Sequence, residues 1–114
     1  MDYDIHAEDE YAAGKKVLFN KNNALQEKEL RVVLHSYEGR AFYWRLLSKC
    51  GIYKTSFTGD NTTFFNEGMR QIGLWALEEV FTHSPESFAI MQAEAAARDI
   101  KYKSDLQSIG GRKV

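Results

Sequence analysis

The sequence predicts a mostly α-helical fold, a small bundle of three or four helices with an irregular loop at about residues 51–60 and extended terminal arms. Three observations predict it. Apolar residues recur at three- and four-residue intervals in several segments. The run Ser84-Pro85-Glu86 has the residue order of a helix start. A length of 114 residues fits one domain whose core needs neither disulfides nor metal.

The first expected helix covers residues 22–37, where charged residues separate the apolar positions Leu25, Leu30, Val33, Leu34 and Tyr37. Ser36 either caps a second helix that begins at about Tyr37 or lies within a continuing first helix. The apolar positions of the following segment are Phe42, Leu46, Leu47 and Cys50, and Gly51 is a suitable helix stop. Whether Gly39 interrupts this path is left open by the sequence.

The segment 51–60 combines two glycines with β-branched and aromatic residues, which indicates a loop, with extended pairing as an alternative. A long helix follows, capped by Asp60 or Thr62 and ending near Thr82 or His83. Its apolar stripe consists of Phe65, Met69, Ile72, Trp75, Ala76 and Val80.

A last helix begins at Ser84-Pro85-Glu86, because serine caps, proline suits the first helical position and glutamate complements the helix dipole. Its inner face is expected at Phe88, Met91, Ala95 and Tyr102. Residues 104–114 are predicted to form a loose tail, because Gly110-Gly111 disfavours regular structure.

The helix faces predict which residues are buried. The expected core consists of Phe42, Leu46, Leu47, Phe65, Ile72, Trp75, Phe88 and Met91. Gly68 and Gly73 are poor helix formers within an apolar stripe, so we expect them to permit the close approach of another segment.

Opposite charges at the two ends suggest a division into an acidic arm (1–21), a helical domain (22–103) and a flexible basic tail (104–114). The five carboxylates of the arm and two basic residues of the tail are candidate partner-binding residues. They are Asp2, Asp4, Glu8, Asp9, Glu10, Arg112 and Lys113. The net charge of −1 gives no bulk attraction to nucleic acid or anionic lipid.

The single cysteine, Cys50, allows no intramolecular disulfide and suits a reducing compartment. The first residues lack the pattern of a signal peptide, and no stretch approaches the length of a membrane span. We therefore expect a soluble protein that is made in a cytoplasm and has no membrane partner.

No residue pattern predicts catalysis, a cofactor or a metal. His6 with the neighbouring carboxylates lacks the spacing that brings ligands together, so a solvated arm is the better interpretation. Ser36 and Ser84 are explained as helix caps rather than nucleophiles. Gly68 and Gly73 lack the Lys-Ser/Thr of a phosphate-binding loop.

The run from Arg40 to Arg45 interleaves aromatic and basic residues, which is typical of single-strand nucleic-acid contacts. Helical geometry distributes Arg40, Tyr43 and Trp44 around the circumference, which favours core packing with extended arginines. These three are further candidate partner-binding residues, and nucleic acid is the lesser alternative as a partner.

Residues 39–76 resemble a family of short tailed-bacteriophage proteins. The resemblance rests on a start of the form R-x-F-x-x-L-L-x-x-x-G-I-Y, which here is Arg40, Phe42, Arg45 to Leu47, Gly51, Ile52 and Tyr53. A T-S-F-T-G turn at residues 55–59 follows, and then an F-x-E-G-x-R-x-x-G segment with Phe65, Glu67, Gly68, Arg70 and Gly73. About a third of the chain is covered, and no catalytic residue is transferred.

The resemblance implies a phage protein synthesised in the bacterial host cytoplasm. Together with the absence of a catalytic, cofactor or metal pattern, it favours a non-enzymatic structural or assembly component of the virion, bound to portal, connector, capsid or internal core proteins in a multimeric assembly. The alternative is a small regulator that binds a host or phage nucleic-acid enzyme, with the charged ends serving as electrostatic arms.

Overall fold

Four helices make up nearly all of the part of the chain that the computed structural model describes, residues 5–53, 59, 60 and 62–111. They are α1 (Ile5–His35), α2 (Tyr37–Lys49), α3 (Thr62–His83) and α4 (Pro85–Gly111). No strand occurs among these residues. The predicted mostly helical fold class is confirmed.

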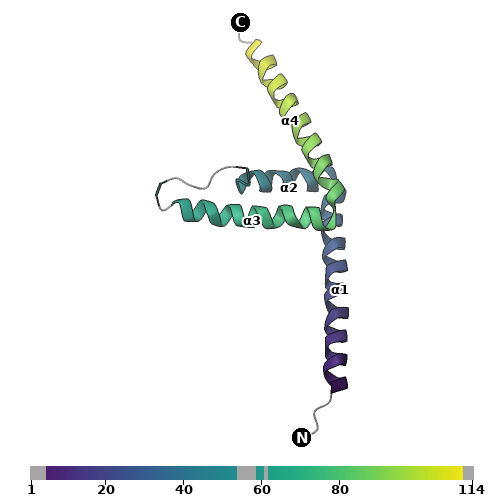
Figure 1. Cartoon of the computed structure of the whole chain (residues 1–114). Helices are drawn as coiled ribbons and strands as arrows, with labels where there is room; N and C mark the ends of the chain where they lie inside the picture. The colour runs from purple at the N-terminus through teal and green to yellow at the C-terminus, as the bar shows by residue number, and fades with distance from the viewer. Residues whose placement is uncertain (1–4, 54–58, 61, 112–114) are drawn as a thin grey trace.

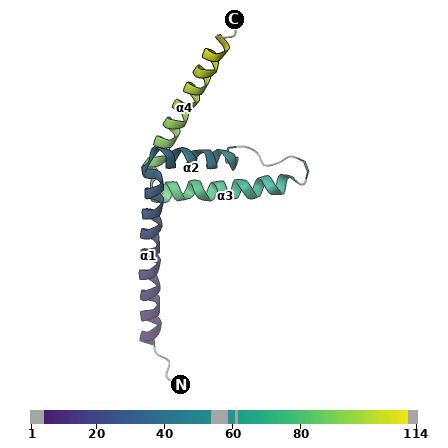
Figure 2. The same cartoon turned by 180° about the vertical axis from the view of Figure 1, so that it is seen from behind.

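The helices form a branched, elongated shape rather than a sphere. In Figure 1 and Figure 2, α1 and α4 extend in opposite directions from a common junction, and α2 and α3 project sideways from it as a hairpin. The molecule measures 91 × 39 × 15 Å, and its radius of gyration is 22.1 Å. A compact domain of this length has a radius of gyration of about 13 Å, so most of each helix lies near solvent.

The turn between α1 and α2 follows from Ser36 and Gly39. Ser36 has an extended backbone (φ −93°, ψ 151°), and its side chain accepts a hydrogen bond of 3.0 Å from the Gly39 amide. The serine therefore caps α2, which settles the alternative that the sequence left open. A Cβ added to Gly39 would lie 1.8 Å from the Val33 carbonyl oxygen, so only glycine fits this corner.

The hairpin of α2 and α3 begins and ends with local signals that the sequence contains. Gly51 follows the α2 C-terminus with φ +69°, a conformation that favours glycine. At the start of α3 the Asp60 carboxylate accepts from the Thr62 amide at 2.9 Å. Gly73 is buried, and a Cβ there would lie 2.5 Å from Cys50 Cβ and 2.6 Å from Ile52 Cγ2. The expectation of a close approach at Gly73 is confirmed.

Gly68 differs from Gly73, because it is exposed and an added Cβ would meet nothing within 4 Å among the described residues. The expected close approach at Gly68 is therefore wrong. The two glycines are five residues apart, and this spacing turns them to different sides of the helix.

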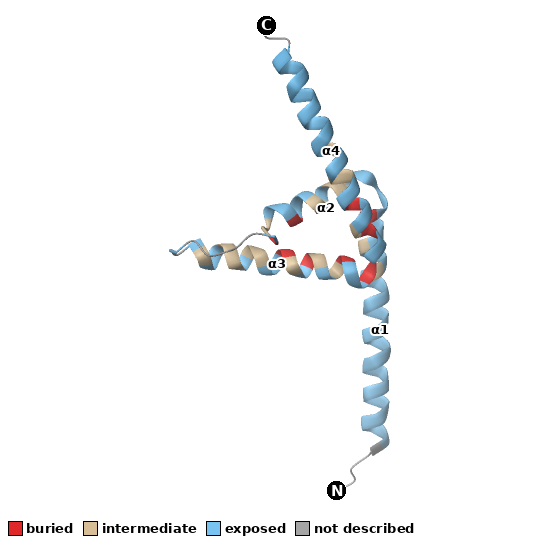
Figure 3. Ribbon diagram, turned by 45° about the horizontal axis from the view of Figure 1, so that its top comes forward, coloured by how far each residue is buried: buried red, intermediate tan, exposed pale blue. Residues whose placement is uncertain are grey.

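The four helices meet at one junction, which we call the hub, built around the buried side chains Leu34, Val80 and Met91. Leu30, Tyr43, Trp44 and Phe88 pack against this cluster. A second buried cluster inside the hairpin consists of Leu47, Ile52 and Ala76. Figure 3 shows that the buried residues lie at the hub and along the facing sides of α2 and α3.

The predicted core is only partly correct. Leu47 and Met91 are buried and Phe88 packs at the hub, as predicted. Five other members of that core are exposed, which corrects the prediction: Phe42, Leu46, Phe65, Ile72 and Trp75. The physical reason is that a hairpin of two helices covers one side of each helix, whereas the prediction assumed a bundle that covers more.

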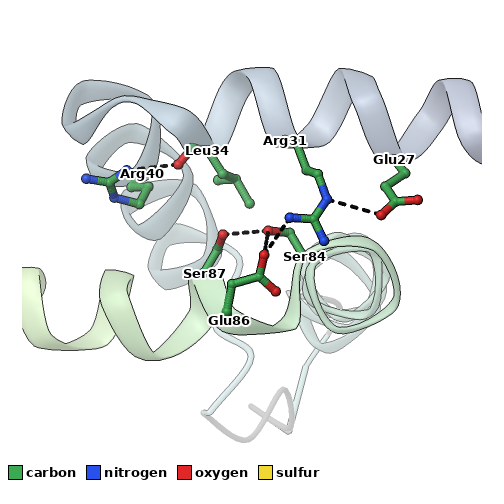
Figure 4. A network of polar contacts seen from close by, with 7 residues as sticks. All are labelled: Glu27, Arg31, Leu34, Arg40, Ser84, Glu86 and Ser87. Carbon is green, nitrogen blue, oxygen red and sulfur yellow. Dashed lines mark hydrogen bonds and ion pairs between the residues drawn. The ribbon is translucent and has the colours of Figure 1, made fainter.

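Polar contacts join α1 to the start of α4 at the hub (Figure 4). Arg31 contacts Glu86 at 2.5 Å and Glu27 at 3.1 Å, and hydrogen bonds to these carboxylates raise its pKa. A backbone hydrogen bond at the start of α4 lowers the pKa of Glu86, and Arg31 lowers it further. The buried hydroxyls of Ser84 and Ser87 lie 2.6 Å apart. The predicted helix start at Ser84-Pro85 is confirmed.

The helices extend further toward the chain ends than the sequence predicted. The first helix begins at Ile5 rather than near residue 22, and the last continues through Leu106 to Gly111 rather than loosening at residue 104. Ion pairs one helical turn apart support the end of α4, with Lys101 2.7 Å from Asp105 and Lys103 3.0 Å from Asp99. The division into arm, domain and tail stays a prediction.

Candidate protein-interaction surfaces

The acidic candidates lie at the outer end of α1. Glu8, Asp9 and Glu10 are exposed on its first turns. Asp2 and Asp4 at one end, and Arg112 and Lys113 at the other, lie outside the described residues. A negative charge in the first turn of a helix is favourable, so Glu8 suits the helix start as well as a basic partner.

Arg40 points into the hub instead of outward. Its side chain contacts Glu94 at 2.6 Å and donates hydrogen bonds of 2.9 Å to the backbone carbonyls of Leu34 and His35. These carbonyls belong to the end of α1, where helical partners are missing. Arg40 thus ties α1, α2 and α4 together, and its role toward a partner stays a prediction.

Tyr43 and Trp44 are also engaged within the chain. The Tyr43 hydroxyl donates to the Ala76 carbonyl of α3 at 2.5 Å, and burial raises the pKa of this tyrosine to about 12. The Trp44 ring lies 5.9 Å from the Phe88 ring, centroid to centroid. Both residues position helices, and a contact of either with a partner stays a prediction.

A groove of about 390 Å³ lies where α1, α2 and α3 meet. Its apolar wall includes Val33, Leu46 and Trp75, and its rim includes Glu29 and Glu79. Trp75 is 60% exposed, although aromatic side chains of this size are usually mostly buried. Sequence periodicity found these apolar residues and assigned Leu46 and Trp75 to the core, because periodicity does not indicate which stripe a neighbouring helix covers.

The outer half of α1 stands alone, since every residue from 6 to 26 is exposed. Three large apolar side chains recur there every seven residues, at Tyr11, Leu18 and Leu25. Tyr11, Gly14, Lys15 and Leu18 surround a shallow hollow of about 430 Å³. This surface was not predicted, because the acidic residues 1–21 were expected to form a solvated arm. The seven-residue spacing is the sequence signal that marks it.

The outer half of α4 continues the stripe that packs at the hub. Phe88 and Met91 lie at the hub, whereas residues 99–111 are all exposed. Tyr102, Leu106 and Ile109 carry the same stripe onward at intervals of four and three residues. The last helix thus has an apolar side that is covered over its first turns and open over its last.

The described residues contain no group of three or more His, Cys, Asp or Glu side chains placed to hold a metal ion. None of the described helices is long and apolar enough to cross a membrane. Ser84 and Ser87, the buried serines, contact each other at the start of α4, which is a structural use of their hydroxyls.

Comparisons with known proteins gave one match. A family model described as Bbp19-like phage protein matches residues 30–93, more than half of the chain. This span begins at the end of α1 and stops within α4, so it contains the hub and the hairpin and leaves out both outer halves. No curated protein and no solved structure matched.

Proposed function

Because the chain belongs to the Bbp19-like phage protein family, we propose that it is a non-enzymatic structural or assembly component of the virion. Its partners in this proposal are portal, connector, capsid or internal core proteins. The observation that carries it is the amount of apolar surface left open on the helices, above all Trp75, Val33 and Leu46 around the groove.

The total exposed area supports an assembly role. The chain has 9235 Å² of accessible surface, whereas a compact protein of 13.1 kDa has about 6,400 Å². The difference is several times the roughly 800 Å² that each partner contributes to a standard protein interface. Large exposed apolar patches on soluble proteins mark interaction sites.

The groove has the anatomy of a protein interface. Two aromatic residues, Tyr43 and Trp75, and aliphatic residues form its apolar wall, and two glutamates lie on its rim. Interfaces combine an apolar centre rich in aromatic residues with a polar rim in this way. An apolar side chain of a virion protein, flanked by a basic residue that faces Glu29 or Glu79, would fit here.

Quantitative mass spectrometry of purified phage particles tests the proposal. We expect the protein in washed particles at a constant ratio to the capsid protein. A phage that carries Trp75→Ala should package less of the protein, because the substitution removes the largest apolar contact in the groove. A phage that carries Glu78→Ala, which changes an exposed residue of the same helix, should package it normally.

Two results would contradict the proposal. The first is abundant protein in the infected-cell lysate with none in the particles, which would favour the regulator. The second is equal packaging of the two variants, which would contradict the role of the groove as the site that binds a virion protein.

A further inference from the structure

The outer halves of α1 and α4 share a pattern that suits helix pairing. On α1 the exposed residues Tyr11 and Leu18 are seven residues apart, and on α4 so are Tyr102 and Ile109. Apolar residues at this interval form the seam of two helices that wrap around each other. Neither seam has a partner among the described residues.

Isolated helices of this length are only marginally stable, and the outer half of α1 contains poor helix formers such as Gly14, Asn22 and Asn23. Most helix stability in proteins comes from packing of an apolar face. Gly110 is likewise a poor helix former near the end of α4. Both outer halves therefore need a cover to persist as helices.

The shape of the molecule supplies the geometry for mutual cover. The chain runs along α1 toward the hub, and along α4 away from it, in roughly the same direction (Figure 1). A copy shifted along the long axis would bring its α1 beside the α4 of the first copy, and the two helices would run parallel. At about 1.5 Å per residue, each outer half spans roughly 20–30 Å, so the two overlap over several turns.

We propose that a second copy of this chain is the partner of each outer half, with the start of α1 in one copy packed in parallel on the end of α4 in the next. This inference rests on the proposed assembly role and identifies a second copy of the chain as one partner in that assembly. The exposed area fits this contact, because its excess over that of a compact protein of the same mass is larger than the area that one partner buries in a standard interface. The net charge of −1 gives little repulsion between copies.

The hollow on α1 fixes the register of the pair. Tyr11, Gly14, Lys15 and Leu18 have the spacing of the four residues that form a hole in knobs-into-holes packing. Leu106, which lies between Tyr102 and Ile109 on α4, is the matching knob. With Leu106 in the hole, Tyr11 lies level with Tyr102, Leu18 with Ile109, and Lys15 close to Asp105.

This contact is heterologous, because it joins two different surfaces of the same chain. Each copy then still offers a free α1 at one end of the assembly and a free α4 at the other. Such contacts generate rings when the rotation closes and filaments when it does not.

A cysteine pair tests the proposal in the full chain with Cys50→Ala as background. Leu18→Cys and Ile109→Cys are made as separate variants, mixed and oxidised. We expect a disulfide dimer that contains one chain of each variant and no dimer from either variant alone, because a disulfide requires Cβ atoms about 3.5–4.5 Å apart. Asn20→Cys, on the opposite side of α1, is the matched control and should not cross-link with Ile109→Cys.

A cross-link of Leu18→Cys with itself would overturn the proposal, because it would pair α1 with α1. Equal cross-linking of the Asn20→Cys control, or no cross-link in any mixture, would also overturn it. These outcomes are separate from the proposed function: a chain packaged in particles without the mixed dimer removes only this inference, and a mixed dimer with no packaging removes only the virion role.

Gly14→Leu separates an effect on association between copies from an effect on the stability of the helix. Leucine favours the helix over glycine, and a Cβ added at residue 14 meets nothing within 4 Å among the described residues, so the helix content of the diluted protein should not fall. Because the leucine fills the hole, association should weaken about tenfold to hundredfold, measured by sedimentation over a range of concentrations. Unchanged association of Gly14→Leu would overturn the knob-and-hole register.

Discussion

The hub and the outer halves of α1 and α4 carry the same kind of apolar spacing, yet the side chains of the one are buried and those of the other are exposed. Met91 at the hub is 0% exposed, whereas Leu106 on the same helix is 49% exposed. The family match covers the hub and omits both outer halves. An apolar stripe therefore predicts a contact. The contact lies within the chain only where another helix of the same chain packs against the stripe.

The largest effect is expected from Gly39→Ala at the corner that makes the hub. The added Cβ would lie 1.8 Å from the Val33 carbonyl oxygen, so the α1–α2 turn must shift. We expect a loss of about 3 kcal/mol or more in the free energy of unfolding, measured by urea denaturation. Gly14→Ala, where an added Cβ meets no atom of the described chain, is the control and should not destabilise. Near-native stability of Gly39→Ala would disprove the corner geometry.

Met91→Ala and Leu106→Ala compare the hub and the outer half on a single helix, α4. Removal of the buried Met91 side chain should cost about 2–5 kcal/mol of unfolding free energy, because it leaves a cavity at the hub. At dilutions that keep the protein monomeric, Leu106→Ala should cost less than about 0.5 kcal/mol, as expected for a surface position. Equal losses in the two variants would mean that the outer half of α4 is buried within its own chain.

Gly73→Ala and Gly68→Ala test the packing of the hairpin with opposite expected signs. A Cβ at residue 73 would press on Cys50 and Ile52, so we expect a loss of about 1–3 kcal/mol. At residue 68 the space is open, and alanine should stabilise the helix by about 0.5–1 kcal/mol. Thermal unfolding of both variants measures the difference, and stabilisation by both would show that the segment after α2 does not approach α3 at Gly73.

The smallest effect is expected from Tyr43 and depends on pH. Its pKa is raised from 10.0 to about 12, so the folded chain holds the neutral phenol more strongly than the unfolded chain does. The resulting stability is complete below pH 10 and is lost as the pH rises through about 12. Tyr43→Phe should remove this loss and cost about 0.5–1.5 kcal/mol at neutral pH, because the bond to the Ala76 carbonyl disappears. Parallel alkaline melting curves of the two proteins would contradict this.

Local signals in the sequence predicted helix boundaries well. Ser36, Gly51, Asp60 and Ser84-Pro85 each lie at the end of a helix in the structure, because capping depends on a few neighbouring residues. The extent of the end helices was underestimated. Gly110-Gly111 argued against regular structure at the end of the chain, and the acidic composition of residues 1–21 suggested an arm, but apolar residues recur at helical spacing in both segments.

The core and the groove were harder to predict from the sequence. Periodicity places Ile72 and Trp75 on one apolar stripe of α3, and this stripe is real. The same periodicity does not tell whether a neighbouring helix lies over that stripe or beside it. The packing of the hairpin decides this, and it depends on contacts between segments far apart in the chain, such as Gly73 with Cys50 and Ile52.

Amide hydrogen exchange of the purified chain at increasing concentration tests most directly the claim that the outer halves are covered by assembly. The account predicts that amides around Leu34 and Met91 are protected at every concentration. Amides of residues 6–26 and 99–111 should exchange fast in dilute protein and become protected as the concentration rises. Strong protection of these segments in dilute monomer, unchanged at high concentration, would contradict the account, because the outer halves would then be stable without a partner.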